Sequence, residues 1–167
     1  MEKRIILSGS GGQGIMFMGK VLAEAALLEG KNVTYLPAYG AEVRGGTANC
    51  TIVISDEEIG SPYAETTDIL VAMNEPSLLR FEAKVRKNGV IIANSSLVTQ
   101  PRGVASPFTQ TAIDLGSPKA ANMVALGCLA KQTGIVSVKS VLTALESFAA
   151  KAQALESNKK AVMAGGA

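Results

Sequence analysis

The segment Gly9-Ser10-Gly11-Gly12-Gln13-Gly14 constrains the fold more than any other part of the chain. It lies between an apolar run, residues 5–7, and a stretch with helical patterning that begins at Ile15. A strand, a glycine turn and a helix N-terminus in that order direct unpaired backbone N–H groups and the positive end of a helix dipole toward one point. The order predicts a βαβ unit whose first turn is suited to a phosphate.

The same glycine spacing satisfies the dinucleotide fingerprint, which also needs an acidic residue about 20 positions further on, at the end of the second strand. The second predicted strand, residues 32–36, instead runs into Pro37-Ala38-Tyr39. The nearest acids are Glu29, at the end of the first helix, and Glu42, six residues beyond the strand. The sequence therefore argues against a nicotinamide dinucleotide. The glycines alone leave open a turn that is purely structural.

Length and charge are those of a single domain. The 167 residues are 47% apolar, which suffices for one core, and no polar or Pro/Gly-rich linker divides them. Sixteen basic and fourteen acidic residues leave a formal charge of +2, without the basic stripe typical of nucleic-acid binding. The most apolar helix, residues 15–28, is interrupted by Lys20 and Glu24, and the pattern of a signal peptide is missing. We expect a cytoplasmic protein that contacts neither nucleic acid nor membrane.

The chain contains no histidine and only two cysteines, Cys50 and Cys128. Histidine is the commonest general base and metal ligand, and an iron–sulfur cluster normally takes four thiolates. Two cysteines this far apart are typical of reduced core thiols. We therefore expect no catalytic residue and no metal site on this chain alone.

The rest of the chain alternates strands and helices, which predicts an α/β fold: a Rossmann-like three-layer sandwich with a mostly parallel sheet, formed by residues 1–167 as a single domain. Further strands are expected at 47–54, 68–73 and 90–94, and helices at 77–86, 109–115 and 117–134. No helix fits before the strand at 47–54, so an ordinary crossover should not precede it. A last helix, from Val138 through Leu155, should be followed by a frayed Ala-Gly-Gly-Ala end.

A second glycine-rich segment, residues 39–47, places Glu42 and Arg44 between flexible backbone positions. Because it follows the second strand, it should emerge at the carboxyl edge of the sheet beside the first glycine turn, where open α/β sheets bind ligands. Arg44 is the stronger candidate, since a guanidinium can grip a phosphate with two hydrogen bonds. The alternative is an exposed ion pair worth about 0–1 kcal/mol. The candidate cofactor-binding residues are Gly9, Gly11, Gly12, Gln13, Gly14, Glu42, Arg44, Gly45, Gly46 and Thr47.

Two further polar positions have plain structural interpretations. Asn74 and Pro76 read first as a strand-to-helix junction and only second as part of a ligand crevice. Asn122, one turn into the predicted helix that starts at Ser117, reads as an amide on a helix surface.

Taken together, these stretches resemble the gamma subunit of 2-oxoacid:ferredoxin oxidoreductases. The motifs that carry the resemblance are, in order, residues 9–14, residues 39–50, Asn74-Glu75-Pro76-Ser77 and residues 121–127. Within the family, Gly-Gly-Thr-Ala-Asn-Cys and the later Ile-Ser-Asp-Glu-Glu-Ile-Gly-Ser-Pro look most like the 2-oxoglutarate and branched-chain 2-oxoacid members. Ala41 departs from the pattern, because a proline is common at that position.

The resemblance implies a complex that decarboxylates a 2-oxoacid oxidatively, giving an acyl-CoA, CO2 and reduced ferredoxin. Thiamine diphosphate, magnesium and iron–sulfur clusters would reside on alpha, beta and delta partner subunits. The gamma subunit, not catalytic alone and binding no cofactor by itself, would help to form the coenzyme A side of the active site. Three alternatives stay open: the beta subunit of an indolepyruvate:ferredoxin oxidoreductase, a free-standing regulatory module that binds coenzyme A or a nucleotide, and a structural subunit whose glycine loops serve assembly.

Overall fold

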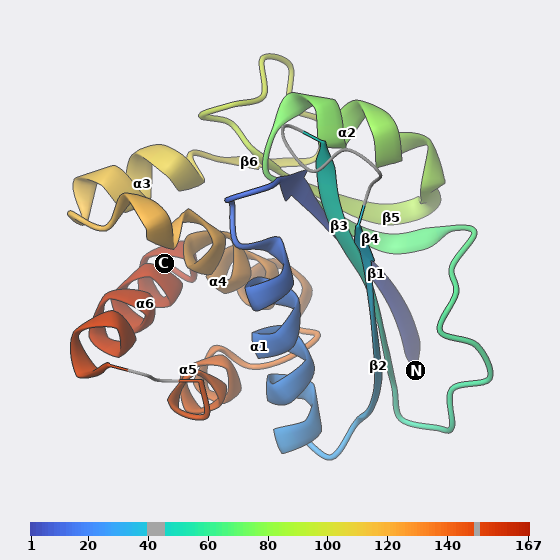
Figure 1. The fold of residues 1–167 in the computed structure, drawn as a ribbon. Helices are drawn as coiled ribbons and strands as arrows, with labels where there is room; N and C mark the ends of the chain where they lie inside the picture. The colour runs from blue at the N-terminus through green and yellow to red at the C-terminus, as the bar shows by residue number, and fades with distance from the viewer. Residues whose placement is uncertain (40–45, 149–150) are drawn as a thin grey trace.

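The computed structural model describes residues 1–39, 46–148 and 151–167 (Figure 1). Six strands form one sheet in the order β2-β3-β1-β4-β5-β6. The strands are β1 (Glu2–Ser10), β2 (Asn32–Tyr39), β3 (Thr47–Ser55), β4 (Thr67–Ala72), β5 (Val85–Asn94) and β6 (Val104–Ser106). The α-helices are α1 (Ile15–Leu28), α2 (Glu75–Phe81), α3 (Phe108–Asp114), α4 (Ala121–Thr133), α5 (Val138–Glu146) and α6 (Ala152–Gly165), and the short 3₁₀ helices are η1 (Glu82–Lys84) and η2 (Pro118–Ala120).

The sheet is mostly parallel, as predicted. β1 pairs in parallel with β4, β4 with β5, and β5 with β6. β3 is the exception, because it runs antiparallel to both β1 and β2. β1 and β2 therefore point the same way but are not neighbours. β2 and β3 are antiparallel neighbours, which agrees with the prediction that no ordinary crossover precedes β3.

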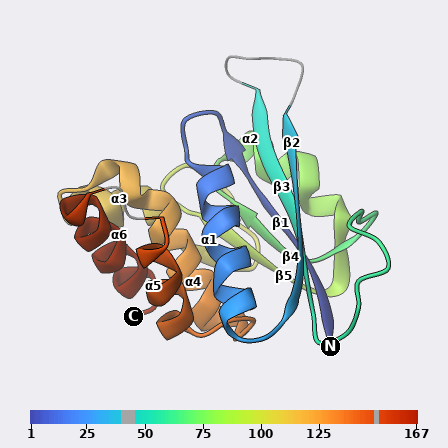
Figure 2. The same cartoon turned by 60° about the horizontal axis from the view of Figure 1, so that its bottom comes forward.

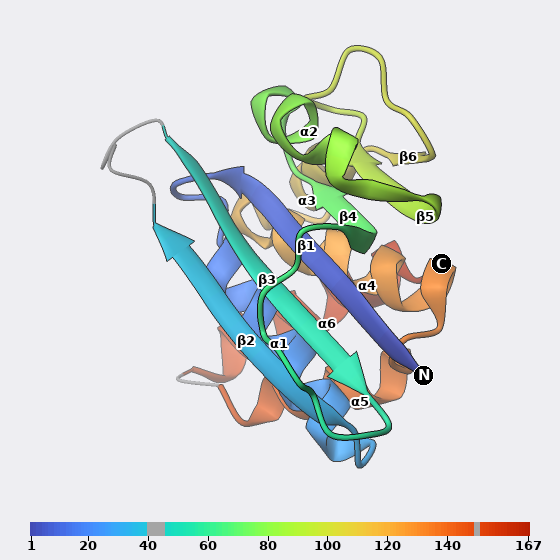
Figure 3. The ribbon, with the colours of Figure 1, turned by 90° about the vertical axis from the view of Figure 1, so that its right-hand side faces the viewer.

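Helices cover the two faces of the sheet unequally (Figures 2 and 3). Helices α1, α3, α4, α5 and α6 pack on one face and share the larger core with Ile5 and Leu7 of β1. The shorter α2 covers the other face, where Ile6 of the same strand joins Leu78 and Phe81 of α2. This alternation along β1 is the period of two that places successive side chains on opposite faces.

Local sequence accounts for how two of the helices begin. Gly14, with a left-handed φ of 70°, turns the chain into α1. Asn74 caps α2, since its side-chain oxygen accepts the backbone N–H of Ser77 at 3.1 Å, and Pro76 lies in the first turn. The predicted strand-to-helix junction at Asn74 is therefore confirmed. α2 ends at Phe81, earlier than the predicted helix end at residue 86. The 3₁₀ helix η1 follows it directly, and β5 begins at Val85 rather than at residue 90.

The predicted last helix is wrong in extent, because the structure contains two helices in its place, α5 and α6. α6 packs closely on α4 through two glycines: a Cβ on Gly165 would lie 1.9 Å from the carbonyl oxygen of Val124, and one on Gly127 would lie 2.0 Å from that of Val162. This contact explains why α6 stays helical to Gly165, within the end that was expected to fray.

None of the helices in the described ranges combines the length and the apolar character that crossing a membrane requires. The cytoplasmic location stays a prediction.

Candidate functional site

The first glycine turn and the two described ends of the second glycine-rich segment lie together at the carboxyl edge of the sheet. Ser10, the last residue of β1, pairs with Thr47, the first residue of β3, and Tyr39 at the end of β2 pairs with Ala48. Gly46 directly precedes this pair. The placement follows the prediction from the strand directions. The candidates Glu42, Arg44 and Gly45 lie outside the described residues, so their roles stay predictions.

Two glycines of the first turn serve close packing. A Cβ on Gly14 would lie 2.4 Å from the Nδ2 atom of Asn122, and one on Gly9 would lie 2.5 Å from the side-chain oxygen of Gln13 and 2.8 Å from Ile15. Any larger residue at these positions must displace its neighbours. For Gly9 and Gly14, the structure thus supplies a packing reason that requires no ligand.

Gly11 and Gly12 are different, because they face open space. A Cβ on either residue would have no atom within 4 Å, and Gly12 has a φ of 89° that favours glycine. Within the described residues, neither backbone N–H donates a hydrogen bond. These two amides lie just before the N-terminus of α1, where a negative group is favoured. Gly11 and Gly12 are thus the part of the turn that a ligand can approach.

Gln13 holds the turn in shape. Its side-chain oxygen accepts the backbone N–H of Ser10 at 2.7 Å, and its side-chain nitrogen lies 3.5 Å from the carbonyl oxygen of Met73 at the end of β4. The backbone N–H of Gln13 also donates to the carbonyl of Ser10 at 3.2 Å. The amide is therefore engaged within the protein, and a direct ligand contact by Gln13 stays a prediction.

Asn122 is not the surface amide that the sequence suggested. It is only 5% exposed, and its Nδ2 atom donates to the carbonyl oxygen of Gly14 at 3.1 Å. Its oxygen accepts the backbone N–H of Met123 at 2.9 Å. Asn122 thus ties the start of α4 to the glycine turn. The contact joins residues 108 positions apart, which no local pattern reveals.

Asn94 fixes the neighbouring part of the same edge, and sequence reasoning missed it. This fully buried side chain at the end of β5 donates to the carbonyl oxygen of Met73 at 3.0 Å and to the hydroxyl of Thr109 at 2.9 Å. It therefore joins the ends of β4 and β5 to α3. A polar residue at the end of a buried strand was the only available indication.

A cavity of about 250 Å³ opens beside the turn. Its lining residues come from several elements at the carboxyl edge and are Gly12, Gln13, Met73, Leu97, Thr109, Pro118, Lys119 and Ala121. Lys119 is the one charged residue among them, and it forms no ion pair with any described residue. A lysine beside free backbone amides suits an anion. The lining offers no histidine, cysteine or carboxylate, so the arrangement can bind and orient but supplies no evident acid, base or nucleophile.

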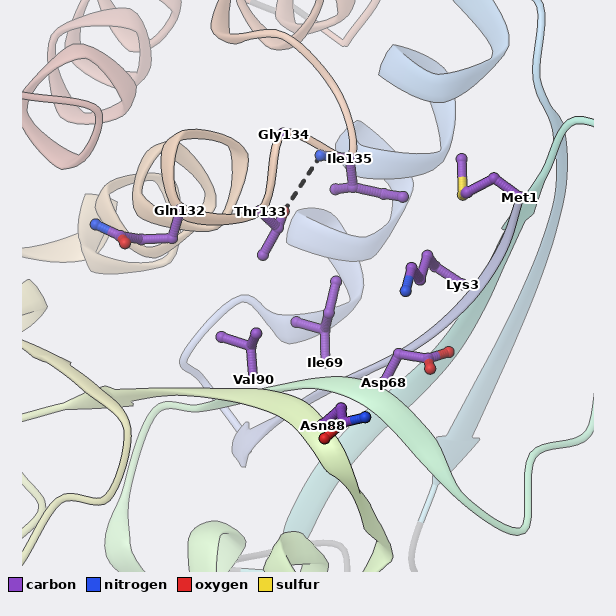
Figure 4. Close-up of a pocket in the computed structure, with 10 residues that line it drawn as sticks. All are labelled: Met1, Lys3, Asp68, Ile69, Asn88, Val90, Gln132, Thr133, Gly134 and Ile135. Carbon is purple, nitrogen blue, oxygen red and sulfur yellow. Dashed lines mark hydrogen bonds between the residues drawn. The ribbon is translucent and has the colours of Figure 1, made fainter.

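A second cavity, of about 300 Å³, lies at the opposite edge of the sheet (Figure 4). Ile69, Val90 and Ile135 line it together with Lys3 and Asp68, and Asp68 already pairs with Arg86 at 2.9 Å. Although it is slightly larger, this cavity includes no residue of the first glycine turn in its lining. We assign the functional site to the carboxyl edge, because the unbonded amides lie there.

Both cysteines are free and buried, which confirms the prediction of core thiols. Burial raises the pKa of the Cys50 thiol to about 12, and burial also raises the pKa of Cys128. Both thiols are therefore protonated and unreactive at neutral pH. Within the described ranges, no three His, Cys, Asp or Glu side chains gather as metal ligands would.

An open, mostly parallel α/β sheet with a glycine turn at its carboxyl edge defines a protein of Rossmann-like fold. Residues 4–167 match the family described as pyruvate ferredoxin/flavodoxin oxidoreductase, and the chain belongs to this family. The resemblance deduced from the motifs is thereby confirmed.

Individual relatives support the same assignment. The 2-oxoglutarate synthase subunit KorC of Archaeoglobus fulgidus is 41% identical over 135 residues, covering 80% of this chain and 72% of KorC. The ketoisovalerate oxidoreductase subunit VorA of Methanothermobacter thermautotrophicus is 38% identical over 171 residues, covering 98% of this chain. The chain spans only 36% of that VorA, so it corresponds to part of a longer polypeptide there.

Two solved structures share the fold over 99% of this chain, each with a TM-score of 0.88. One is a keto/oxoacid ferredoxin oxidoreductase gamma subunit from Geobacter sulfurreducens PCA, which is 32% identical; the match covers 94% of that subunit. The other is the 2-oxoglutarate:ferredoxin oxidoreductase from Magnetococcus marinus with 2-oxoglutarate, coenzyme A and succinyl-CoA bound, 26% identical and covered to 30%.

Proposed function

We propose that this chain is the gamma subunit of a 2-oxoacid:ferredoxin oxidoreductase, which converts a 2-oxoacid such as 2-oxoglutarate into an acyl-CoA, CO2 and reduced ferredoxin. Family membership and the similarity to KorC and VorA support the reaction class. One observation supports the role of this chain. The open backbone amides of Gly11 and Gly12 lie at the same sheet edge as the start of β3.

At this edge, the chain forms the coenzyme A side of the active site. The amides of Gly11 and Gly12 and the ammonium group of Lys119 suit the phosphates of the coenzyme. Arg44 and Glu42 act from the adjoining loop, with Gly45, Gly46 and Thr47 shaping the backbone there. The coenzyme A bound in the similar Magnetococcus marinus structure is consistent with this ligand.

The reactive parts belong to partners. Thiamine diphosphate with its magnesium ion, and the iron–sulfur clusters, reside on alpha, beta and delta subunits, and ferredoxin docks on the complex. The donor set of this chain does not fit an iron–sulfur cluster, because the chain holds only two cysteines, both buried. The chain binds and orients coenzyme A and excludes water from it, and the chemistry takes place on the partner subunits.

A nicotinamide dinucleotide is the poorer alternative for a structural reason. In a dinucleotide-binding sheet the second strand lies beside the first and carries the acid that holds the ribose. Here antiparallel β3 occupies the place beside β1, and β3 begins at this edge with Thr47.

Purification of the tagged chain from its native host tests the proposal. We expect it to bring down proteins that contain thiamine diphosphate and iron–sulfur clusters, and the complex should reduce ferredoxin only when a 2-oxoacid and coenzyme A are both present. Comparison of 2-oxoglutarate, 2-oxoisovalerate and indolepyruvate separates the substrate classes, including the indolepyruvate alternative. Recovery of a solitary protein that binds NAD or ATP tightly would favour the regulatory module instead.

Substitution of Arg44 separates a binding role from an assembly role. In an intact complex, Arg44→Ala should raise the KM for coenzyme A, because it removes a guanidinium from the proposed phosphate site. An unchanged KM with impaired assembly would support the purely structural subunit.

A further inference from the structure

The cavity at the amino edge of the sheet has an apolar floor. Its volume is about 300 Å³, and it lies where the end of α4 passes over the first residues of β1 and β4 (Figure 4). Ile69 of β4 and Val90 of β5 point into it from the sheet, and Ile135, which follows α4, lies opposite them. Ile69 is only 4% exposed and Ile135 only 7%. Because all three side chains branch at the β carbon, this floor is also stiff.

Two irregularities of the backbone bound this space. α4 ends at Thr133, and Gly134, with a left-handed φ of 62°, turns the chain away from the helix axis. On the side of the sheet, residues 86–89 of β5 have no partner in the ladder with β4. Bulges of this kind are common at sheet edges and beside active sites. The cavity is therefore bounded by defined backbone turns.

Lys3 carries a charge that the described part of the protein does not neutralise. It lies on the same face of β1 as the core residue Ile5, since side chains alternate along a strand. Its ammonium group is directed toward Ile69 and Ile135 (Figure 4). Within the described ranges, Lys3 forms no ion pair. The cavity thus combines an apolar floor with one uncompensated positive charge.

The other polar groups around the cavity are already engaged. One carboxylate oxygen of Asp68 lies 2.9 Å from the guanidinium of Arg86, and the other accepts the backbone N–H of Arg4 at 2.8 Å. The hydroxyl of Thr133 donates to the carbonyl oxygen of Leu129 at 2.7 Å. These contacts leave Lys3 as the group that can attract a ligand.

We propose that this cavity binds a short aliphatic carboxylate, with the carboxylate group on Lys3 and the hydrocarbon chain between Ile69, Val90 and Ile135. A cation beside a stiff apolar floor is complementary to a ligand with one anionic and one apolar end. Ligand pockets span about 300–1,000 Å³, and this cavity lies at the lower end. It therefore suits a molecule far smaller than a coenzyme. The site is separate from the proposed coenzyme site at the other edge of the sheet.

Calorimetric titration of the protein purified from its native host tests the site. The probe is 4-methylpentanoate, and the neutral amide of the same shape, 4-methylpentanamide, is the comparison. We expect the acid to bind with a Kd of about 0.1–1 mM and the amide to bind roughly tenfold more weakly, because it lacks the charge that pairs with Lys3. Leucine and 4-methyl-2-oxopentanoate differ from the probe only at the carbon beside the carboxylate. Their relative affinities show whether the site prefers a plain acid, an amino acid or a 2-oxoacid.

Matched variants separate the charge from the apolar floor. Lys3→Ala should weaken binding of the acid roughly tenfold and leave binding of the amide unchanged. Val90→Phe places a larger side chain in the cavity and should abolish binding of both. Lys160→Ala removes an exposed lysine from α6, which contributes no residue to the lining, and should change neither dissociation constant. Equal melting temperatures establish that the variants are folded, and the exposed position of Lys3 keeps that test valid if Val90→Phe is unstable.

Three results would overturn the site. They are a wild-type protein that does not bind 4-methylpentanoate, equal affinities for the acid and the amide, and an unchanged dissociation constant for the acid in folded Lys3→Ala. Each of these results leaves the proposed function standing, because coenzyme A binds at the opposite edge of the sheet in that proposal.

Discussion

At the scale of single residues, the glycines of the first turn have two separable roles. Gly14 has a left-handed backbone and the amide of Asn122 where a Cβ would lie, whereas Gly11 has neither constraint. Gly14→Ala should therefore reduce the free energy of unfolding by about 1–3 kcal/mol, whereas Gly11→Ala should change it by no more than about 0.5 kcal/mol. Urea denaturation measures both. Gly11→Ala should instead raise the KM for coenzyme A, and a Gly11→Ala complex with normal KM would show that no ligand approaches there.

Thr34 offers a second prediction at this scale, because its buried hydroxyl has no hydrogen-bond partner among the described residues. Thr34→Val keeps the branched shape and removes the unsatisfied group, so it should stabilise the protein by about 1 kcal/mol. Thr67→Val is the matched control. The Thr67 hydroxyl lies 2.8 Å from the carbonyl oxygens of both Arg4 and Ile69, and its loss should destabilise by about 1–3 kcal/mol. Equal signs for the two variants in urea denaturation would contradict this argument.

At the scale of elements, the packing of α4 against α6 depends on two glycines that no local pattern marked. Gly165→Ala would force a Cβ to within 1.9 Å of the carbonyl oxygen of Val124, so the helices must separate. We expect a loss of about 1–3 kcal/mol in the free energy of unfolding, the usual cost of overpacking. Gly60→Ala is the control, since a Cβ there meets no atom within 4 Å. A similar thermal stability for both variants would show that the end of α6 is not held by this contact.

Local sequence patterns predicted most of the elements but not the contacts between distant parts of the chain. β1 to β5 and the Asn74 cap were predictable because apolar runs, Gly and Pro act locally. The short strand β6, Val104–Ser106, was not predicted. The division of the last helix into α5 and α6, and the buried position of Asn122, depend on contacts over long sequence distances. The position of Tyr39 and Thr47, the described ends of the second glycine-rich segment, beside the first glycine turn was predicted from strand direction alone. The hydrogen bond from Arg80 of α2 to the Thr47 hydroxyl was not predicted, because it joins residues 33 positions apart that only the assembled sheet brings together.

At the scale of the whole molecule, the buried thiols report whether residues 1–167 behave as one domain. Cys50 belongs to the sheet and Cys128 to α4, yet both lie in the same core. Burial raises the pKa of Cys50 to about 12 and raises that of Cys128. A thiol reagent at pH 8 can therefore label either cysteine only after the protein unfolds around it. In a cooperative domain, the same unfolding event exposes both.

The two thiols should therefore be labelled with the same dependence on urea concentration, which mass spectrometry of tryptic peptides measures residue by residue. Raising the pH has a predictable sign: the thiol of Cys50 favours the folded state fully below its unfolded pKa of about 8.5, and this contribution is lost as pH rises toward 12. Wild type should consequently lose stability above pH 8.5 faster than Cys50→Ala does. Labelling of Cys128 at urea concentrations that leave Cys50 protected would mean that the helical layer opens apart from the sheet, and the single-domain prediction would fail.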